Sequence, residues 1–355
     1  MRFLSWALIG KARKKLLRVM SETPPCWAPV REFHVSAHEG PVFLPPWAYY
    51  TTTAETYQRP SVRIERLNVD TGAVEVIREE ISANVPNGMI GPFKKGDGSF
   101  ELFTCEQGFQ HPTHKAYPHN AKARISKTVL NVDGTHSYKV VFEETDTQPL
   151  NSPNDICVAS DGAIWFTDPT YGSMQGFRPK PPKANEAIYR LHPETSKLSM
   201  VLDLGDDETN KPNGICFSPC DSYLYFTNTS AALPGKSFCR CRQRSVWRVQ
   251  LNADKTGLDR DTLLKIADVD PPEAFSDETA IPDGLKYVDG FLITSCGKHI
   301  AMVDLGEDVL MGERVKHIHL PCVEEVTNFA LSQDNRQMIV CGNNKLVLCK
   351  RVVRD

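Results

Sequence analysis

Internal repetition constrains this chain more than any other feature of its sequence. A turn followed by an apolar strand pattern occurs at 161–167, 221–227 and 289–294, with weaker copies at 98–104 and 334–341. A second phrase, an Asn or Asp that usually follows proline, precedes each copy. Repetition at a spacing of tens of residues is typical of solenoids and propellers. The repeat therefore decides the fold class before any single motif is considered.

Each repeat predicts one four-stranded blade. The unit consists of a polar residue followed by four short strand patterns, and successive units are spaced by about 45 to 70 residues, the size of a propeller blade. We call the polar residue that opens each unit its leading residue. The leading residues are Glu39, Asn87, Asn154, Asn213, Asp283 and Asn328. We therefore expect an all-β fold, a six-bladed β-propeller, in which residues 30–35 supply a missing strand to the last blade and so remove an exposed sheet edge.

The propeller is expected to occupy residues 26–355, and residues 1–25 to form a basic N-terminal extension. Residues 1–20 contain no acidic side chain, and their apolar run at 3–9 precedes the lysines, which is the wrong order for a secretory signal. A mitochondrial presequence, a helix on a membrane surface and an unstructured basic tail remain open for this segment. No run of about 18 apolar residues is present to span a bilayer.

Composition favours a small-molecule partner. The chain has 41 Lys and Arg against 44 Asp and Glu, a net charge of -3, so it lacks the positive field that attracts nucleic acid. Its 11 cysteines lack the paired C-x-x-C spacing of thiolate zinc sites. We expect them to be reduced, mostly buried thiols, which favours a reducing compartment and a cytoplasmic location. The aromatic residues in the strand patterns, Trp165, Phe166, Tyr225 and Phe226, are expected in the core.

The leading residues also predict a metal site. Blades are related by rotation about the channel, so equivalent positions lie on a ring, and all six leading side chains offer oxygen donors. Calcium takes six to eight oxygen ligands, whereas zinc or copper would favour His or Cys. A single Asn-Gly or Asp-Gly is usually a turn, but its recurrence after proline favours a ring. We expect Ca²⁺, with another divalent cation as the alternative.

Several segments resemble one known family. They are 38–43 (His-Glu-Gly-Pro-Val-Phe), 151–172, Pro212-Asn213-Gly214-Ile215 and Ile281-Pro282-Asp283-Gly284-Leu285. These segments resemble the gluconolactonase and regucalcin (senescence marker protein-like) family of six-bladed propellers, with paraoxonase and diisopropyl fluorophosphatase as more distant relatives. The resemblance implies a calcium-dependent lactonase. It also implies that Glu39, Asn154, Asn213 and Asp283 are the metal ligands and that Asp283 is the general base.

Further residues are expected to contact the substrate or the reacting water. Asn87 and Asn328 lie on the predicted ring, and Tyr171 follows a strand end in the segment most similar to the family. Cys105-Glu106 resembles the family's second-blade Cys-Glu stretch, but the arginines that follow it there are absent, which favours a larger or more apolar substrate. His299 is a second candidate base because the unperturbed pKa of histidine suits proton transfer near neutral pH. Its alternative role is that of a histidine in the channel wall.

The expected activity is hydrolysis of a small-molecule lactone or ester, with the cation acting as a Lewis acid on the carbonyl oxygen. The sequence lacks the Gly-x-Ser-x-Gly and His-Glu-x-x-His motifs, so a serine nucleophile is unsupported. Two alternatives stay open. One is a hydrolase or synthase of another class on the same propeller, phosphotriesterase-like or strictosidine synthase-like. The other is a non-catalytic calcium-binding propeller, because fold does not determine function.

Overall fold

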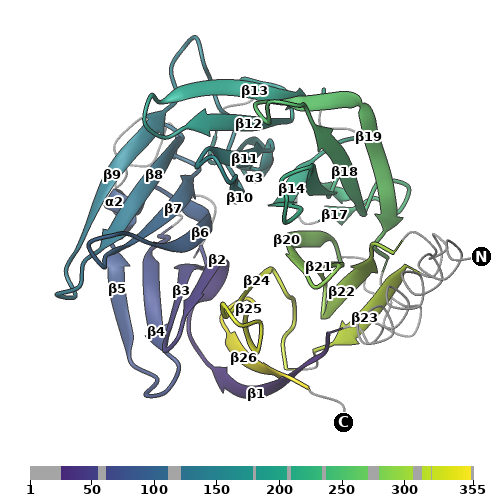
Figure 1. The fold of residues 1–355 in the computed structure, drawn as a ribbon. Coiled ribbons are helices and arrows are strands. Elements are labelled where there is room, and N and C mark those ends of the chain that lie inside the picture. The colour runs from purple at the N-terminus through teal and green to yellow at the C-terminus, as the bar shows by residue number, and fades with distance from the viewer. Residues whose placement is uncertain are drawn as a thin grey trace, which may run out of the picture.

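The computed structural model describes residues 25–54, 61–110, 121–178, 181–205, 209–233, 237–270, 280–306, 314–320 and 322–352. Within these ranges the chain forms six four-stranded antiparallel sheets around a central channel (Figure 1). The predicted all-β, six-bladed propeller is confirmed. The predicted basic extension lies almost entirely outside the described residues, so the domain boundary near residue 25 stays a prediction.

The first three blades follow one another along the chain, each running from the channel outward. Blade 1 contains β2 (Ala37–Leu44), β3 (Trp47–Thr52), β4 (Ile64–Asn68) and β5 (Val74–Arg78). Blade 2 contains β6 (Pro86–Lys94), β7 (Phe100–Glu106), β8 (Arg124–Leu130) and β9 (His136–Glu143). Blade 3 contains β10 (Ile156–Val158), β11 (Ile164–Asp168), β12 (Ala187–His192) and β13 (Lys197–Asp203).

The next three blades repeat this order. Blade 4 contains β14 (Pro212–Phe217), β15 (Tyr223–Asn228), β18 (Ser245–Leu251) and β19 (Leu258–Asp268). Blade 5 contains β20 (Pro282–Val288), β21 (Phe291–Cys296), β22 (His299–Asp304) and β23 (Val315–His319). Blade 6 contains β24 (Asn328–Leu331), β25 (Gln337–Cys341), β26 (Leu346–Arg351) and β1 (Trp27–Phe33). The connections carry the helices α2 (Glu80–Ala83) and α3 (Tyr171–Gln175) and the hairpin β16 (Ala232–Leu233) to β17 (Ser237–Phe238).

Blade 6 is completed by a strand from the other end of the chain. β1 pairs antiparallel with β26, from Trp27 opposite Arg351 to Phe33 opposite Leu346. Figure 1 shows this purple strand beside the yellow one. The predicted closure is confirmed, although the strand begins three residues earlier than the pattern indicated. It covers the edge of β26 that would otherwise be exposed.

In the described part of the chain, six of the hydrophobic clusters each lie between two neighbouring blades. Successive side chains of a strand point to opposite faces of its sheet, so a blade contributes to the clusters on both sides. Along β11, Trp165 packs toward blade 4 and Phe166 toward blade 2. Trp165, Phe166, Tyr225 and Phe226 are all buried, as predicted. This packing holds the blades at a constant spacing around the channel.

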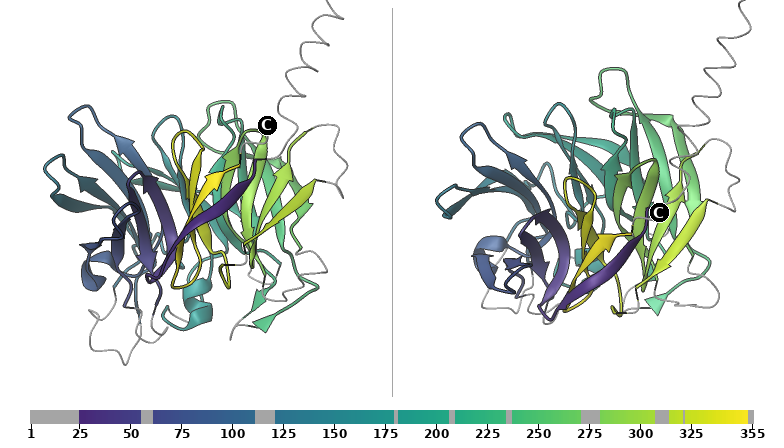
Figure 2. Two further views of the ribbon diagram at one scale, coloured as in Figure 1. Left: turned by 90° about the horizontal axis from the view of Figure 1, so that it is seen from below. Right: turned by 60° about the horizontal axis from the view of Figure 1, so that its bottom comes forward.

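The leading residues all lie at one mouth of the channel. Five of them stand near the start of the innermost strand of their blade, and Asn154 lies two residues before β10. Helix α3 and the hairpin β16–β17 project from the same end of the propeller (Figure 2). The fold therefore collects the six leading residues, helix α3 and the β16–β17 pair at a single face.

Glycines allow the innermost strands to approach closely at this mouth. A glycine follows the leading residue in four blades: Gly40, Gly88, Gly214 and Gly284. A Cβ on any of them would come closer than 3.0 Å to an atom of the next blade's leading residue. The recurrence of glycine in the repeat is therefore a packing requirement of the ring rather than only a turn signal.

Substituting one of these glycines is expected to destabilise the propeller. In Gly214→Ala the new Cβ would clash with the carbonyl oxygen of Asp283, a backbone atom that cannot rotate away. We expect a loss of about 2 kcal/mol or more in the free energy of unfolding, measured by urea titration. Gly96→Ala is the matched control, because its Cβ would meet no atom within 4 Å. Equal stability of the two variants would contradict the packing argument.

Candidate active site at the channel mouth

The six leading residues form a continuous ring. The side-chain nitrogen Nδ2 of Asn328 donates a hydrogen bond to Oε2 of Glu39 at 2.9 Å, which joins the last blade to the first. Thr167 Oγ1 donates to the carbonyl oxygen of Asn213 at 2.8 Å, joining blades 3 and 4. The glycine contacts described above join the remaining neighbours. The structure thus brings together all six residues that the repeat aligns, while their roles stay predictions.

Two carboxylates on this ring repel each other. Glu39 is buried, and Asp283 is partly exposed. Although Asp283 keeps some exposed surface, desolvation of its carboxyl group raises its pKa well above the usual value, and the negative charge of Glu39 raises it further. Burial also raises the pKa of Glu39; the nearby His38 opposes this shift, and Asp155 adds to it. A cation beside these carboxylates would offset both the desolvation and the repulsion.

The amides of the ring also leave oxygen atoms available. Oδ1 of Asn87 and Oδ1 of Asn213 are buried and have no hydrogen-bond partner in the described part of the chain. An unsatisfied buried acceptor costs about 1–3 kcal/mol, so such atoms usually have a partner. A cation bound at the ring would provide one. The donor set therefore fits a hard cation that accepts both carboxylate and amide oxygens, such as calcium.

A site for a softer metal is not evident. Among the residues that the structure describes, no three His, Cys, Asp or Glu side chains gather closely enough to hold a metal ion. The ring combines two carboxylates with neutral amides, so it falls outside the imidazole and thiolate sites that zinc and copper prefer.

Tyr171, predicted to bind substrate, contacts a leading residue. It begins helix α3, and its hydroxyl oxygen accepts a hydrogen bond from Nδ2 of Asn213 at 3.1 Å. The same hydroxyl is hydrogen-bonded to the hydroxyl of Thr229. The ammonium of Lys211 lies 5.6 Å from the centroid of the ring, and Tyr171 is only 7% exposed. The aromatic ring therefore offers little surface for stacking a substrate.

Asn328 and Asn87, the two amides predicted to contact substrate, differ in whether their side-chain atoms are already hydrogen-bonded. Both polar atoms of the Asn328 side chain are used within the protein: Nδ2 by Glu39, and Oδ1 as acceptor of the Phe329 amide at 2.8 Å. Asn87 is partly exposed. Of these two amides, Asn87 is thus the one with an oxygen available to a cation or a substrate.

Glu106, also predicted to bind substrate, is held in a buried ion-pair network. Its backbone pairs with Pro86, next to Asn87, but its side chain is fully buried. One carboxylate oxygen lies 2.7 Å from Nη1 of Arg78, and the other pairs with Arg124. The structure places this carboxylate beside the ring and directs it toward the two arginines.

His299, the second candidate base, lies outside the ring. It begins β22, the third strand of blade 5, and β21 separates it from β20, which carries Asp283. Its ring centroid is 5.0 Å from that of His319 and 5.7 Å from that of His317. The three histidines form a cluster on the two outer strands of blade 5, and the role of His299 stays a prediction.

Sequence reasoning missed two titratable side chains beside the ring. Asp155 stands where most repeats have glycine, and its Oδ2 lies 3.9 Å from Nζ of Lys286. His38, which precedes Glu39, forms a 2.8 Å hydrogen bond between its Nδ1 and Oδ1 of Asn343. The break in the Asn-Gly pattern at blade 3 was the signal for Asp155. The proximity of His38 to Asn343 depends on the closure of blade 6 against blade 1 and has no local signal.

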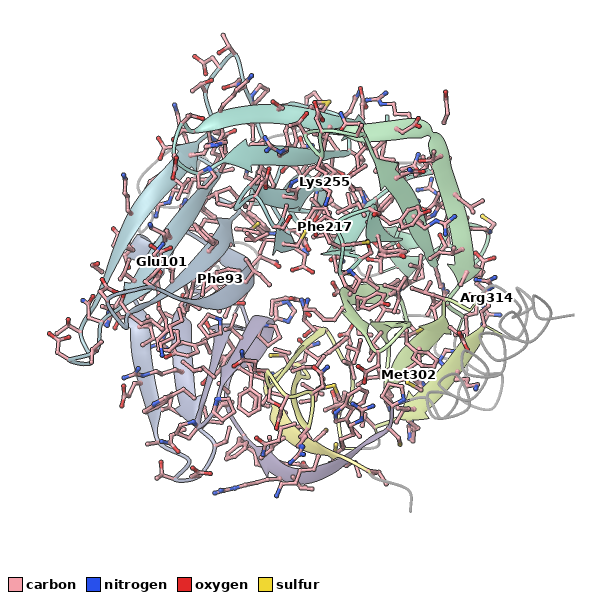
Figure 3. All side chains as sticks on the ribbon, in the orientation of Figure 1. Phe93, Glu101, Phe217, Lys255, Met302 and Arg314 are labelled. Carbon is pink, nitrogen blue, oxygen red and sulfur yellow. The ribbon has the colours of Figure 1, made fainter. Side chains whose placement is uncertain are left out.

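The opposite half of the channel is mainly apolar. A cavity of about 430 Å³ lies there, lined by the later residues of all six innermost strands. Phe93 of β6 and Phe217 of β14 belong to this lining, and Figure 3 shows them beside the central opening. Lys286 is the single charged residue of the lining. The channel therefore has a polar, acidic end and an apolar end.

Comparison with known proteins identifies the family. The family model described as SMP-30/Gluconolactonase/LRE-like region matches residues 60–342. The chain belongs to this family. The resemblance noted in the repeats is thereby confirmed, and it extends over most of the propeller.

Individual relatives of this SMP-30/gluconolactonase/LRE-like chain align over less of its length. Lactonohydrolase oryL of Aspergillus oryzae is 30% identical over 172 residues, 45% of this chain and 37% of the relative. A gluconolactonase of Zymomonas mobilis is 32% identical over 157 residues, 42% of each chain. The aligned part thus spans about two fifths of these relatives.

Solved structures support the same fold. A gluconolactonase from Xanthomonas campestris superposes with a TM-score of 0.63 at 22% identity, covering 93% of this chain and 95% of the other. A luciferin-regenerating enzyme superposes with a TM-score of 0.59 at 13% identity over 93% and 96% of the two chains. In the described ranges of this family member, no helix is both long and apolar enough to cross a membrane.

Removing Glu106 is expected to cost stability. Glu106→Ala would leave Arg78 buried without its carboxylate, and breaking a buried pair in this way costs about 3–5 kcal/mol. Glu75→Ala is the control, since it removes an exposed partner of Arg66 and should cost about 0–1 kcal/mol. Urea unfolding measures both. A Glu106→Ala protein of full stability with a raised KM would instead support the predicted contact with substrate.

The histidine cluster is expected to make stability depend on pH. Burial, together with the neighbouring His299, lowers the pKa of His317 to about 4. The unfolded chain binds this proton near pH 6.5, so the folded state loses stability as pH falls from about 6.5 toward 4. Thermal unfolding between pH 7 and pH 4 should show a shallower decline for His317→Gln than for the native chain. Identical declines would exclude His317 as a contributor.

Proposed function

We propose that this protein is a calcium-dependent hydrolase that opens a lactone ring at the channel mouth. The observation that carries the proposal is the ring itself, where two mutually repelling carboxylates lie beside a buried amide oxygen that has no hydrogen-bond partner among the described residues. Glu39, Asn154, Asn213 and Asp283 would hold the cation. Calcium suits this set because it accepts carboxylate and amide oxygens in flexible geometry.

The relatives support lactone hydrolysis as the reaction. The curated relatives are named lactonohydrolase and gluconolactonase, and the family model carries gluconolactonase in its description. The matched part covers the repeats that contain Asn154, Asn213 and Asp283, three of the four proposed ligands.

The cation, when bound, would supply Lewis-acid stabilisation of the oxygen that gains charge when water attacks the lactone carbonyl. The two carboxylates would have different roles. Glu39 is buried and accepts hydrogen bonds from Asn328 Nδ2 and from the amide of Gly40, so its carboxylate is held in place and would serve as a ligand. Asp283 is partly exposed at the mouth and can reach a water molecule.

Asp283 would therefore accept the proton of the attacking water and return it to the ring oxygen that leaves. Water and lactone are consumed, and one hydroxy acid is formed. Proton transfer by a positioned base contributes about 10²- to 10⁴-fold to the rate. The partly exposed Asn87 would face the substrate from the neighbouring side of the ring.

The test combines metal removal with one substitution. Hydrolysis of a panel of sugar-derived and alkyl lactones is expected to stop when a calcium chelator is added and to return with excess Ca²⁺. Asp283→Asn should reduce kcat by at least about 10²-fold while the propeller stays folded by circular dichroism. Asp268→Asn, an exposed carboxylate on β19, is the control and should keep full activity. Activity that persists in the chelator would refute the proposal.

A further inference from the structure

The side-chain amide of Asn213 can bind a cation only in one orientation. Its oxygen Oδ1 is an acceptor, whereas its nitrogen Nδ2 carries two hydrogens and repels a cation. Oxygen and nitrogen have nearly the same shape, so the surrounding hydrogen bonds decide which of them faces the ring. The contacts of Asn213 therefore determine whether this residue can act as a ligand.

A chain of hydroxyl groups leads away from this amide and ends at a backbone carbonyl. The hydroxyl of Thr229 donates to the carbonyl oxygen of Lys211 at 3.2 Å. A carbonyl oxygen can only accept, so the Thr229 hydroxyl donates its only hydrogen to this carbonyl. In its hydrogen bond with Tyr171, Thr229 must then be the acceptor and Tyr171 the donor.

The same reasoning extends to Asn213. Once the Tyr171 hydroxyl has donated its hydrogen to Thr229, its oxygen can only accept in the contact with Asn213. The atom of Asn213 that lies 3.1 Å from this hydroxyl is therefore Nδ2. The other atom, Oδ1, is left without a hydrogen-bond partner among the described residues and is available to a cation.

The carbonyl group of Lys211, at which this series of hydrogen bonds ends, is held in place by buried contacts. The carbonyl of Lys211 also accepts the amide of Thr229 at 2.9 Å, and the ammonium of Lys211 lies 3.0 Å from Oε1 of Glu186. Lys211 and Glu186 are almost completely buried. Nζ of Lys211 also donates to the hydroxyl of Thr170, the residue before Tyr171, at 2.9 Å. One ion pair thus holds both the carbonyl and the start of α3.

We propose that Tyr171 and Thr229 are positioning residues whose directed hydrogen bonds keep Oδ1 of Asn213 facing the ring. This inference rests on the proposed function, because it requires that the ring binds a divalent cation. Without the Thr229 hydroxyl, the Tyr171 hydroxyl would be free to donate its hydrogen to the Asn213 amide. The amide would then turn and present Nδ2 to the cation.

The test measures calcium binding rather than turnover. Isothermal titration calorimetry with CaCl₂ on the full chain, freed of metal, is expected to show 10- to 100-fold weaker binding for Thr229→Val, about the effect of losing a residue that orients a metal ligand. Thr229→Ser keeps the hydroxyl and should bind within about threefold of the native protein. Tyr171→Phe, which removes the other hydroxyl, is the second variant and should weaken binding to a similar extent.

A double-variant cycle separates orientation from general damage. A carboxylate has two equivalent oxygens and needs no orienting partner. In an Asn213→Asp background, adding Thr229→Val should therefore change the calcium affinity by less than about threefold. A merely structural role of Thr229 would lower the affinity equally in both backgrounds, and thermal unfolding in chelator would reveal any loss of folding.

The outcomes distinguish the two proposals. If the native chain binds calcium and Thr229→Val binds it equally well, the orienting role is wrong and the proposed function is unaffected. If the native chain binds no divalent cation, the proposed function fails and the orienting role fails with it. Should Thr229→Val not fold, the Tyr171→Phe measurement decides, and unchanged affinity there would overturn the inference.

Discussion

The close approach of six inner strands at one mouth of the channel is the constraint on which the site depends. Hydrophobic clusters between the blades determine the spacing of the blades, and the glycines after the leading residues let neighbouring strands come together. Glu39 and Asp283 are thereby held near each other although their charges repel. The stability of the interblade core thus offsets an unfavourable arrangement at the mouth, which is typical of functional sites.

Buried polar groups outside the ring hold the segments that carry its members. The carboxylate of Asp168 accepts the amides of Asn151 and Ser152, both at 2.8 Å, just before Asn154 in the sequence. Arg178 lies 2.7 Å from Glu144 and donates to the carbonyl of Asn151 at 2.8 Å. These contacts fix a connection that has no regular secondary structure. A ligand placed on such a segment can only be held accurately if its backbone is anchored in this way.

Polarity divides the channel. At the mouth, the leading residues present two carboxyl groups and four amides; at the other end, the same strands present apolar side chains such as Phe93 and Phe217. Asp155 and Lys286 bring an opposite-charge pair into the channel. Each innermost strand runs along the channel from the mouth with the leading residues. Two positions of the repeat that are only a few residues apart therefore lie at different ends of the channel. The chemistry of the mouth is therefore confined to a thin layer of the propeller.

Much of this arrangement could be predicted from the sequence. The repeat determined the blade number, the ring closure by the N-terminal strand and the residues that share the ring, because rotation about the channel places equivalent repeat positions at equivalent points in space. The aromatic core residues also followed from their places in strand patterns. These properties depend on local periodicity, which a single sequence contains.

Properties that depend on contacts between distant segments were decided only by the tertiary structure. Glu106 and Tyr171 occupy the region expected for substrate contacts, but Arg78, Arg124, Asn213 and Thr229 engage their polar atoms. His299 was selected for its chemistry, yet its position in β22 places it among other histidines. The sequence by itself determined which residues lie on the ring. Only the folded chain decided which of their atoms are available, because hydrogen-bond direction and ion pairing depend on partners from other blades.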